Sequence, residues 1–144
     1  MANFWKLRVE AKVFNPIIRL TSRMMTEKIK AGFGNKPISF EAKRLPYQSY
    51  WLGLMFRTRN TENLLFDLPG RWGIHSFFVF FSFLAVWLDE KNKVLDWRIV
   101  RPFTFLARPR KKFAKLAEIP VNKRNRLLLS NFTTTRERFK YLAG

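Results

Sequence analysis

Three clusters of basic residues toward the C-terminal end of the sequence are its clearest candidates for binding chemistry. They are Arg108, Arg110, Lys111, Lys112 and Lys115; then Lys123, Arg124 and Arg126; then Arg136, Arg138 and Lys140. Aromatic residues are interleaved with these cations, namely Phe113, Phe132, Phe139 and Tyr141. Cations beside aromatic rings are typical of surfaces that follow a phosphate backbone and stack exposed bases. The pattern therefore predicts an RNA-binding surface.

The net charge is concentrated at the two ends of the chain. Residues 101–144 contain 12 Lys/Arg and 2 Asp/Glu, a net charge of +10, whereas residues 51–100 contain 6 and 5, a net charge of +1. Residues 1–50 contain 10 and 3, a net charge of +7, and they add Arg19, Arg23 and Lys30 to the candidate RNA-binding residues. Self-repulsion of this size opposes folding, so an anionic partner is expected. RNA is the first candidate, and a lipid headgroup surface is the second.

The residues that could support catalysis are few and scattered. His75 is the only histidine, and Ser76 follows it directly, but neighbours in a strand point to opposite faces. The chain has no cysteine, which excludes a disulfide, a thiolate metal site and a cysteine nucleophile. We therefore predict a non-catalytic protein without metal or cofactor. The absence of cysteine also agrees with a location in the reducing cytoplasm.

The size and composition of the chain predict one folded domain. It has 144 residues, of which 47% are hydrophobic and 17% aromatic. Its most apolar segment, residues 74–88, would span about 22 Å as a helix, less than the roughly 30 Å of a bilayer core. The aromatic and β-branched residues of this segment favour a buried strand instead.

Local patterns predict strands in the middle of the chain and a helix near each end. Asn15 and Pro16 are a typical helix start, and an amphipathic helix is expected up to Lys30, with its apolar stripe on the core or its basic face on RNA or a membrane. A capping box at Thr134 and Glu137 predicts a last helix over residues 135–142. The expected strands are 38–45, 64–66, 83–88, 94–100 and 113–119, with a hairpin turn at 89–93.

The order of short motifs in the middle of the chain resembles the uncharacterised family called domain of unknown function 192. The similar motifs are Gly53–Arg57 (GLMFR), Leu64–Phe66, His75–Phe78, Val86–Asp89, Arg101-Pro102 and Glu118-Ile119-Pro120. The resemblance covers about residues 38–120 and implies a compact, mainly β domain with no established reaction. The chain departs from the family at Ser82, at Leu84 or Ala85, and at Val121-Asn122, which implies that part of any family pocket is lost.

Arg57, the last residue of the GLMFR motif, has two alternative roles. It could lie at the mouth of a pocket. It could instead satisfy buried carbonyl groups or pair with Asp67, because arginine forks often serve structural pairs.

We therefore expect a mainly β (α+β) protein, with a small barrel or sandwich in residues 37–120. A basic N-terminal arm, residues 1–36, and a basic C-terminal extension, residues 121–144, would flank it. The function expected is that of a non-catalytic RNA-binding protein associated with the ribosome, with ribosomal RNA and ribosomal proteins as partners. The alternatives are a peripheral membrane protein and a domain that binds or converts a small ligand.

Overall fold

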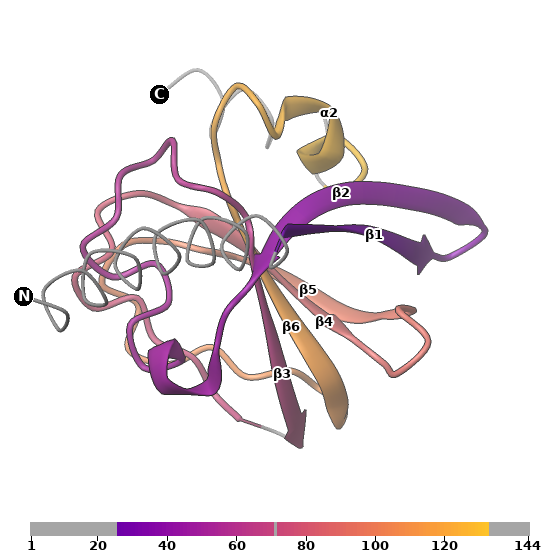
Figure 1. Ribbon diagram of the computed structural model, residues 1–144, viewed down its shortest axis with the longest axis horizontal. Coiled ribbons are helices and arrows are strands. Elements are labelled where there is room, and N and C mark those ends of the chain that lie inside the picture. The colour runs from indigo at the N-terminus through magenta and orange to yellow at the C-terminus, as the bar shows by residue number, and fades with distance from the viewer. Residues whose placement is uncertain (1–25, 71, 133–144) are drawn as a thin grey trace, which may run out of the picture.

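The computed structural model describes residues 26–70 and 72–132 (Figure 1). Within them the chain forms six strands and two short helices. The strands are β1 (Thr26–Phe33), β2 (Lys36–Arg44), β3 (Leu64–Gly70), β4 (Phe83–Leu88), β5 (Val94–Val100) and β6 (Phe113–Pro120). The helices are the 3-10 helix η1 (Tyr47–Ser49) and α2 (Arg126–Leu129). No helix in this part of the chain is long and apolar enough to cross a membrane.

The six strands form one curled sheet in the order β1-β2-β3-β6-β4-β5. The last strand in the sequence, β6, therefore lies in the interior of the sheet, between β3 and β4. The curl brings the two edge strands together at one end, where the Gly32 amide donates to the carbonyl oxygen of Asn92 at 3.1 Å. The prediction of a mainly β fold with little helix is confirmed.

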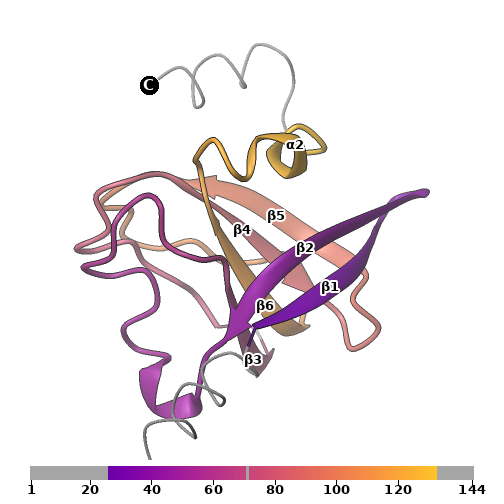
Figure 2. The ribbon, with the colours of Figure 1, turned by 45° about the horizontal axis from the view of Figure 1, so that its top comes forward.

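At β4 both faces of the sheet are buried, because this strand is apolar on each side. Leu84, Val86 and Leu88 belong to the core inside the curl, and Phe83, Ala85 and Trp87 belong to a second core on the outer face. Helix α2 and the residues after it cover the inner core (Figure 2). Three long loops cover the outer core.

Phe132 closes the inner core between the two edge strands. Its ring stacks on Phe33 of β1, with the ring centroids 4.7 Å apart, and meets Trp97 of β5 edge-on at 5.6 Å. Such aromatic pairs stabilise by about 0.5–1.5 kcal/mol beyond the area they bury. The C-terminal segment therefore holds the curl closed on the side that β-strand pairing leaves open.

The helix predicted up to Lys30 is wrong over its last five residues, which belong to β1 (Thr26–Phe33). Here burial has a period of two: Ile29 and Ala31 are buried, while Lys28 and Lys30 are exposed. Pairing with β2 along the whole of β1 overrides the helical spacing of the preceding apolar residues. The rest of the predicted helix and the helix predicted at 135–142 lie outside the described residues.

The apolar segment 74–88 is a strand only in its last six residues, which form β4. Before β4 the chain is a loop, in which Phe78 has a φ of 58° and interrupts any extended run. His75 is exposed and Ser76 is fully buried, as expected for neighbours that point apart. The hairpin of β4 and β5 and the strands β2, β3 and β6 match the predicted ones.

Candidate nucleic-acid interface

Three loops pack side by side over the outer face of the sheet, and we call their surface the loop face: residues 46–60, 72–82 and 101–112. Backbone hydrogen bonds join them. Ile74 and Ala107 exchange two bonds of 2.8 Å, and the Phe56 amide donates to the Phe78 carbonyl at 3.0 Å. The loops thus form one continuous surface although they are far apart in the sequence.

Ser76 is the buried centre of this loop arrangement, with 0% of its surface exposed. Its hydroxyl donates to the Arg101 carbonyl at 2.6 Å and accepts from the Thr104 amide at 2.6 Å. Its backbone also bonds the Thr104 carbonyl and the Phe103 amide, at 3.0 and 3.1 Å. One small polar residue therefore fixes two of the three loops to each other.

The loop face exposes large apolar side chains in unusual number. About half or more of the surface of each is in solvent: Tyr47, Trp51, Phe56, Trp72, Phe78, Phe80, Phe103, Phe105 and Leu106. The same three loops contain seven Arg/Lys and no Asp/Glu: Arg57, Arg59, Arg101, Arg108, Arg110, Lys111 and Lys112. Extended apolar patches on soluble proteins mark interaction sites, and this one is suited to an anionic partner.

Three of the exposed phenylalanines lie on strained backbone. Phe56, Phe78 and Phe103 have φ values of 59°, 58° and 58°, in the left-handed region. This conformation costs about 1–2 kcal/mol for a residue with a Cβ atom, and Gly or Asn adopts it more easily. The other non-glycine residue with positive φ in the described ranges is Asn92, in the turn between β4 and β5. Strain combined with exposed aromatic area does not serve folding, so it points to function.

A pocket of about 380 Å³ opens within the loop face, lined by aromatic side chains and by Glu118 of β6. Trp51 and Trp72 contribute to its wall, and the Trp72 indole N–H donates to the Pro69 carbonyl at 3.2 Å. Gly73 also lines it, and a Cβ atom there would lie 2.5 Å from the Leu106 side chain. The Leu106 and Arg108 side chains therefore pack directly on the backbone of Gly73.

Glu118 is the buried ionisable group of this pocket, with 6% of its surface exposed. Its Oε2 atom is buried and has no hydrogen-bond partner within the described part of the chain. Burial raises the pKa of the Glu118 carboxyl to about 8, although the Arg57 charge and the Leu54 amide oppose the shift. Gly53, at a φ of 46°, lies close to this carboxyl: a Cβ atom at Gly53 would be 3.2 Å from Glu118 Oε2.

The predicted RNA-binding residues fall at several separate places. Arg108, Arg110, Lys111 and Lys112 are exposed at the end of the loop face, just before β6. Lys115, within β6, is half-buried and donates to the Asn92 side chain at 2.8 Å. Lys123, Arg124 and Arg126 are exposed beyond the other end of β6, and Lys30 is exposed on β1. Because β6 has eight residues, the cations before this strand and those after it are separated by about 26 Å. Arg19, Arg23, Arg136, Arg138 and Lys140 lie outside the described residues.

Two of the aromatic residues predicted to stack bases are buried in the cores, so that prediction is wrong for them. Phe113 and Phe132 are each 5% exposed and belong to the outer and the inner core. They bury their rings because strand alternation and the closure of the curl direct them inward. The exposed rings of the loop face were missed, since a run such as Phe77–Phe81 has the composition of a buried strand.

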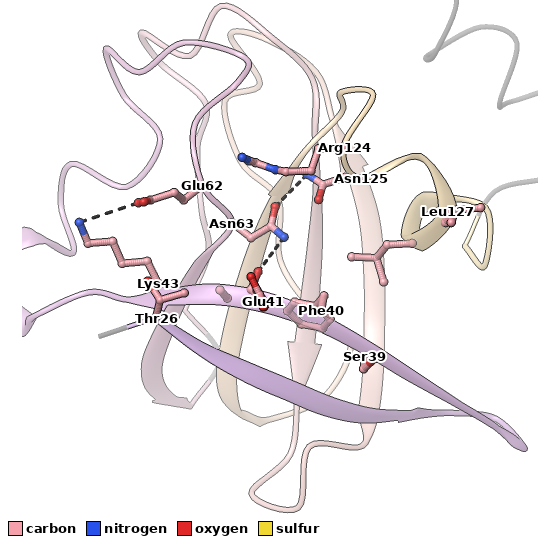
Figure 3. Close-up of a pocket in the computed structure, with 12 residues that line it drawn as sticks. Thr26, Ser39, Phe40, Glu41, Lys43, Glu62, Asn63, Arg124, Asn125 and Leu127 are labelled. Carbon is pink, nitrogen blue, oxygen red and sulfur yellow. Dashed lines mark hydrogen bonds and ion pairs between the residues drawn. The ribbon is translucent and has the colours of Figure 1, made fainter. Parts of the chain in front are cut away.

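A second pocket, of about 400 Å³, lies between β2 and the segment around α2 (Figure 3). Its charges balance: Lys43 lies 3.8 Å from Glu62, and Glu41 and Arg124 also line it. Arg124 donates to the Thr61 carbonyl. With two carboxylates among its lining residues, this pocket is a poorer site for a polyanion than the loop face.

Buried asparagines tie the C-terminal segment to the sheet beside this second pocket. The Asn125 side chain donates to Asn63 and to the Pro120 carbonyl, each at 2.8 Å. Asn63 in turn donates to the Glu41 carbonyl at 2.9 Å (Figure 3). These bonds satisfy polar groups inside the fold, so the asparagines have a structural role.

Arg57 takes one of its expected structural roles. Its Nε atom donates to the Gly53 carbonyl at 3.0 Å. The expected pair with Asp67 is wrong, because Asp67 pairs with Arg44. Arg57 thus braces the turn that passes over Glu118.

Comparison with known proteins shows the fold. No family model matches the chain, and no curated protein matches it. A protein of unknown function from Novosphingobium aromaticivorans DSM 12444 superimposes with a TM-score of 0.58 at 14% identity, over 66% of this chain and 73% of that one. A protein from Sinorhizobium meliloti 1021, provisionally named a transcription regulator, has a TM-score of 0.58 at 12% identity, over 66% and 80%. At these identities the likeness concerns architecture.

Proposed function

We propose that the protein binds RNA through the loop face. One observation carries the proposal: exposed phenylalanines held on strained backbone lie among seven cations, in loops without a carboxylate. The cations before β6 would bind phosphates, and the exposed rings would stack unpaired bases, an interaction of about 1–3 kcal/mol per base. The partner proposed first is structured ribosomal RNA in the cytoplasm.

The distribution of charge favours RNA over a membrane surface. Exposed cations lie at both ends of β6 and on β1, so only some of them share the loop face with the exposed aromatic rings. A flexible polyanion can pass from one cluster to the next, whereas a bilayer meets one face at a time. Bases also give the exposed rings stacking partners that lipid headgroups do not provide.

The proposal is tested by the affinity for RNA across a salt series. Binding should fall strongly between 50 and 200 mM salt, as for several phosphate contacts. Replacing Arg108, Arg110, Lys111 and Lys112 together by alanine should reduce the slope of log K against log salt by about 3. The matched control replaces four exposed cations outside the proposed RNA path, Lys36, Lys91, Lys93 and Arg98.

Two results would contradict the proposal. An unchanged slope in the quadruple variant would show that these cations do not contact phosphates. Flotation with anionic phospholipid vesicles, without binding to RNA at low salt, would instead identify a membrane-surface protein.

A further inference from the structure

We propose that the Glu118 pocket takes one unpaired base of the bound RNA, which stacks on the tryptophans of the wall and forms hydrogen bonds with the Glu118 carboxyl. This inference rests on the proposed RNA binding and assigns the pocket a part in it. The pocket and the RNA-binding loops are the same structure, because residues 50–55 and 72–75 line the pocket and belong to the loop face.

The dimensions and walls of the pocket suit a single flat ring system. Its volume of about 380 Å³ is at the lower end of the roughly 300–1,000 Å³ typical of small-ligand pockets, too small for a paired helix. Trp51 and Trp72 are 71% and 63% exposed, so both rings retain free surface for stacking. Because the indole N–H of Trp72 is bonded to Pro69, that ring is already oriented.

Glu118 supplies a buried polar contact in the pocket. Its Oε2 atom has no hydrogen-bond partner in the described part of the chain, and leaving such a buried atom unsatisfied is costly. Because the pKa of this carboxyl is about 8, it holds a proton at neutral pH and can both donate and accept a hydrogen bond. The Watson–Crick edge of each unpaired RNA base has a donor next to an acceptor, so Glu118 can bind any of the four bases.

Two arginines near the pocket would hold the phosphates on either side of the inserted base. Arg57, from residues 46–60, is close enough to Glu118 that its charge opposes the rise in the pKa of that carboxyl. Arg108, from residues 101–112, packs over Gly73, since a Cβ atom there would be 3.0 Å from Arg108 Cγ. His75, from residues 72–82, lines the pocket and is exposed. Each of the three loops thus places a basic or neutral group, and no second carboxylate, around the opening.

The test compares three RNA hexamers, rA6, rC6 and rU6, with inorganic polyphosphate as a probe that has no bases. Wild-type protein should bind all three hexamers and should show quenching of tryptophan fluorescence with the RNA only. Trp51→Ala and Trp72→Ala should each weaken rA6 binding about tenfold and leave polyphosphate binding unchanged. Leu127→Ala is the control: Leu127 is 84% exposed in α2 and lies outside the loop face.

Glu118→Met removes the hydrogen-bonding carboxyl while nearly conserving volume, and it should weaken the binding of all three hexamers and leave polyphosphate binding unchanged. Melting curves confirm that each variant is folded. If wild-type protein binds the hexamers but the tryptophan variants bind them equally well, the pocket inference is overturned and RNA binding stands. If wild-type protein binds none of the hexamers, the proposed function itself fails. Unchanged binding of the hexamers by Glu118→Met would overturn the role of Glu118.

Discussion

The two sides of the curled sheet use aromatic residues and cations in opposite ways. On the α2 side, Phe132 is buried between Phe33 and Trp97, and the nearby Arg124 donates to a backbone carbonyl. On the loop side, Phe103 and Phe105 are 56% and 80% exposed and are followed by a run of exposed cations. The α2 side stabilises the fold, whereas the loop side presents apolar and basic groups to solvent. Similar sequence composition therefore serves two different purposes in one small protein.

The largest expected effect tests the structural role of the α2 side. Phe132→Ala removes the ring that closes the inner core and should lower the free energy of unfolding by about 3–5 kcal/mol. Urea denaturation measures the loss. Under conditions where the variant remains folded, its affinity for RNA should equal that of the wild type. A stable Phe132→Ala protein would show that the two sides do not differ in this way.

The second prediction concerns the buried carboxyl under the loop face. Since the pKa of Glu118 rises from 4.5 to about 8 in the folded protein, folded protein holds a proton that the unfolded chain releases between these values. Stability should therefore fall as the pH rises through this window, by an amount on the order of a few kcal/mol, and level off above about pH 8. Glu118→Gln should lack this dependence, as measured by unfolding at pH 5, 7 and 9. Parallel pH profiles for both proteins would contradict it.

A smaller effect, of opposite sign, is expected for the strained phenylalanines. Phe103→Asn places a residue that tolerates the left-handed region where φ is 58°. Relief of the strain raises the free energy of unfolding, and loss of the edge contact between Phe103 and Phe80 lowers it. The free energy of unfolding should therefore be unchanged or higher by up to about 1 kcal/mol. The affinity for RNA should nevertheless fall several-fold. A clear loss of stability with full RNA affinity would assign Phe103 to the fold rather than to binding.

The smallest effect is expected for cations on the α2 side. Replacing Lys123 and Arg126 by alanine should reduce the salt slope of RNA binding by about 1 or less, against about 3 for the four cations before β6. If both sets of substitutions reduced the salt slope equally, the two sides would not differ in RNA binding, and the RNA path would extend around the molecule. Anisotropy titrations at several salt concentrations measure both sets in the same way.

The sequence predicts the strands that have turn signals on both sides. The β4–β5 hairpin has apolar runs around a polar turn, and β2 alternates before Pro46, so local pattern is sufficient for both. It does not predict β1. Met24, Met25, Lys28 and Ile29 have the spacing of one helix face, although residues 28–31 also alternate as in a strand. Only the pairing with β2, a non-local contact, decides between them.

The candidate site was predicted in part. The basic residues before β6 were identified from charge, and they are exposed as expected. Glu118 was noted only as part of a motif, although a carboxylate between Ala117 and Ile119 in an apolar strand is an unusual residue to bury. The exposure of Phe78 and Phe103 could not be predicted, because it depends on left-handed backbone set by contacts between loops. The resemblance to domain of unknown function 192 remains a prediction.

The position of β6 has a consequence for synthesis on the ribosome. This strand is the last of the six to be made, yet it forms hydrogen bonds with both β3 and β4. Until β6 emerges from the exit tunnel, no strand joins β1-β2-β3 to β4-β5. The apolar loops of the nascent chain then have no complete sheet on which to pack. Folding of the sheet must therefore wait until β6 has been made, so chaperones that bind nascent chains would meet a long, apolar and cationic chain rather than a partly finished domain.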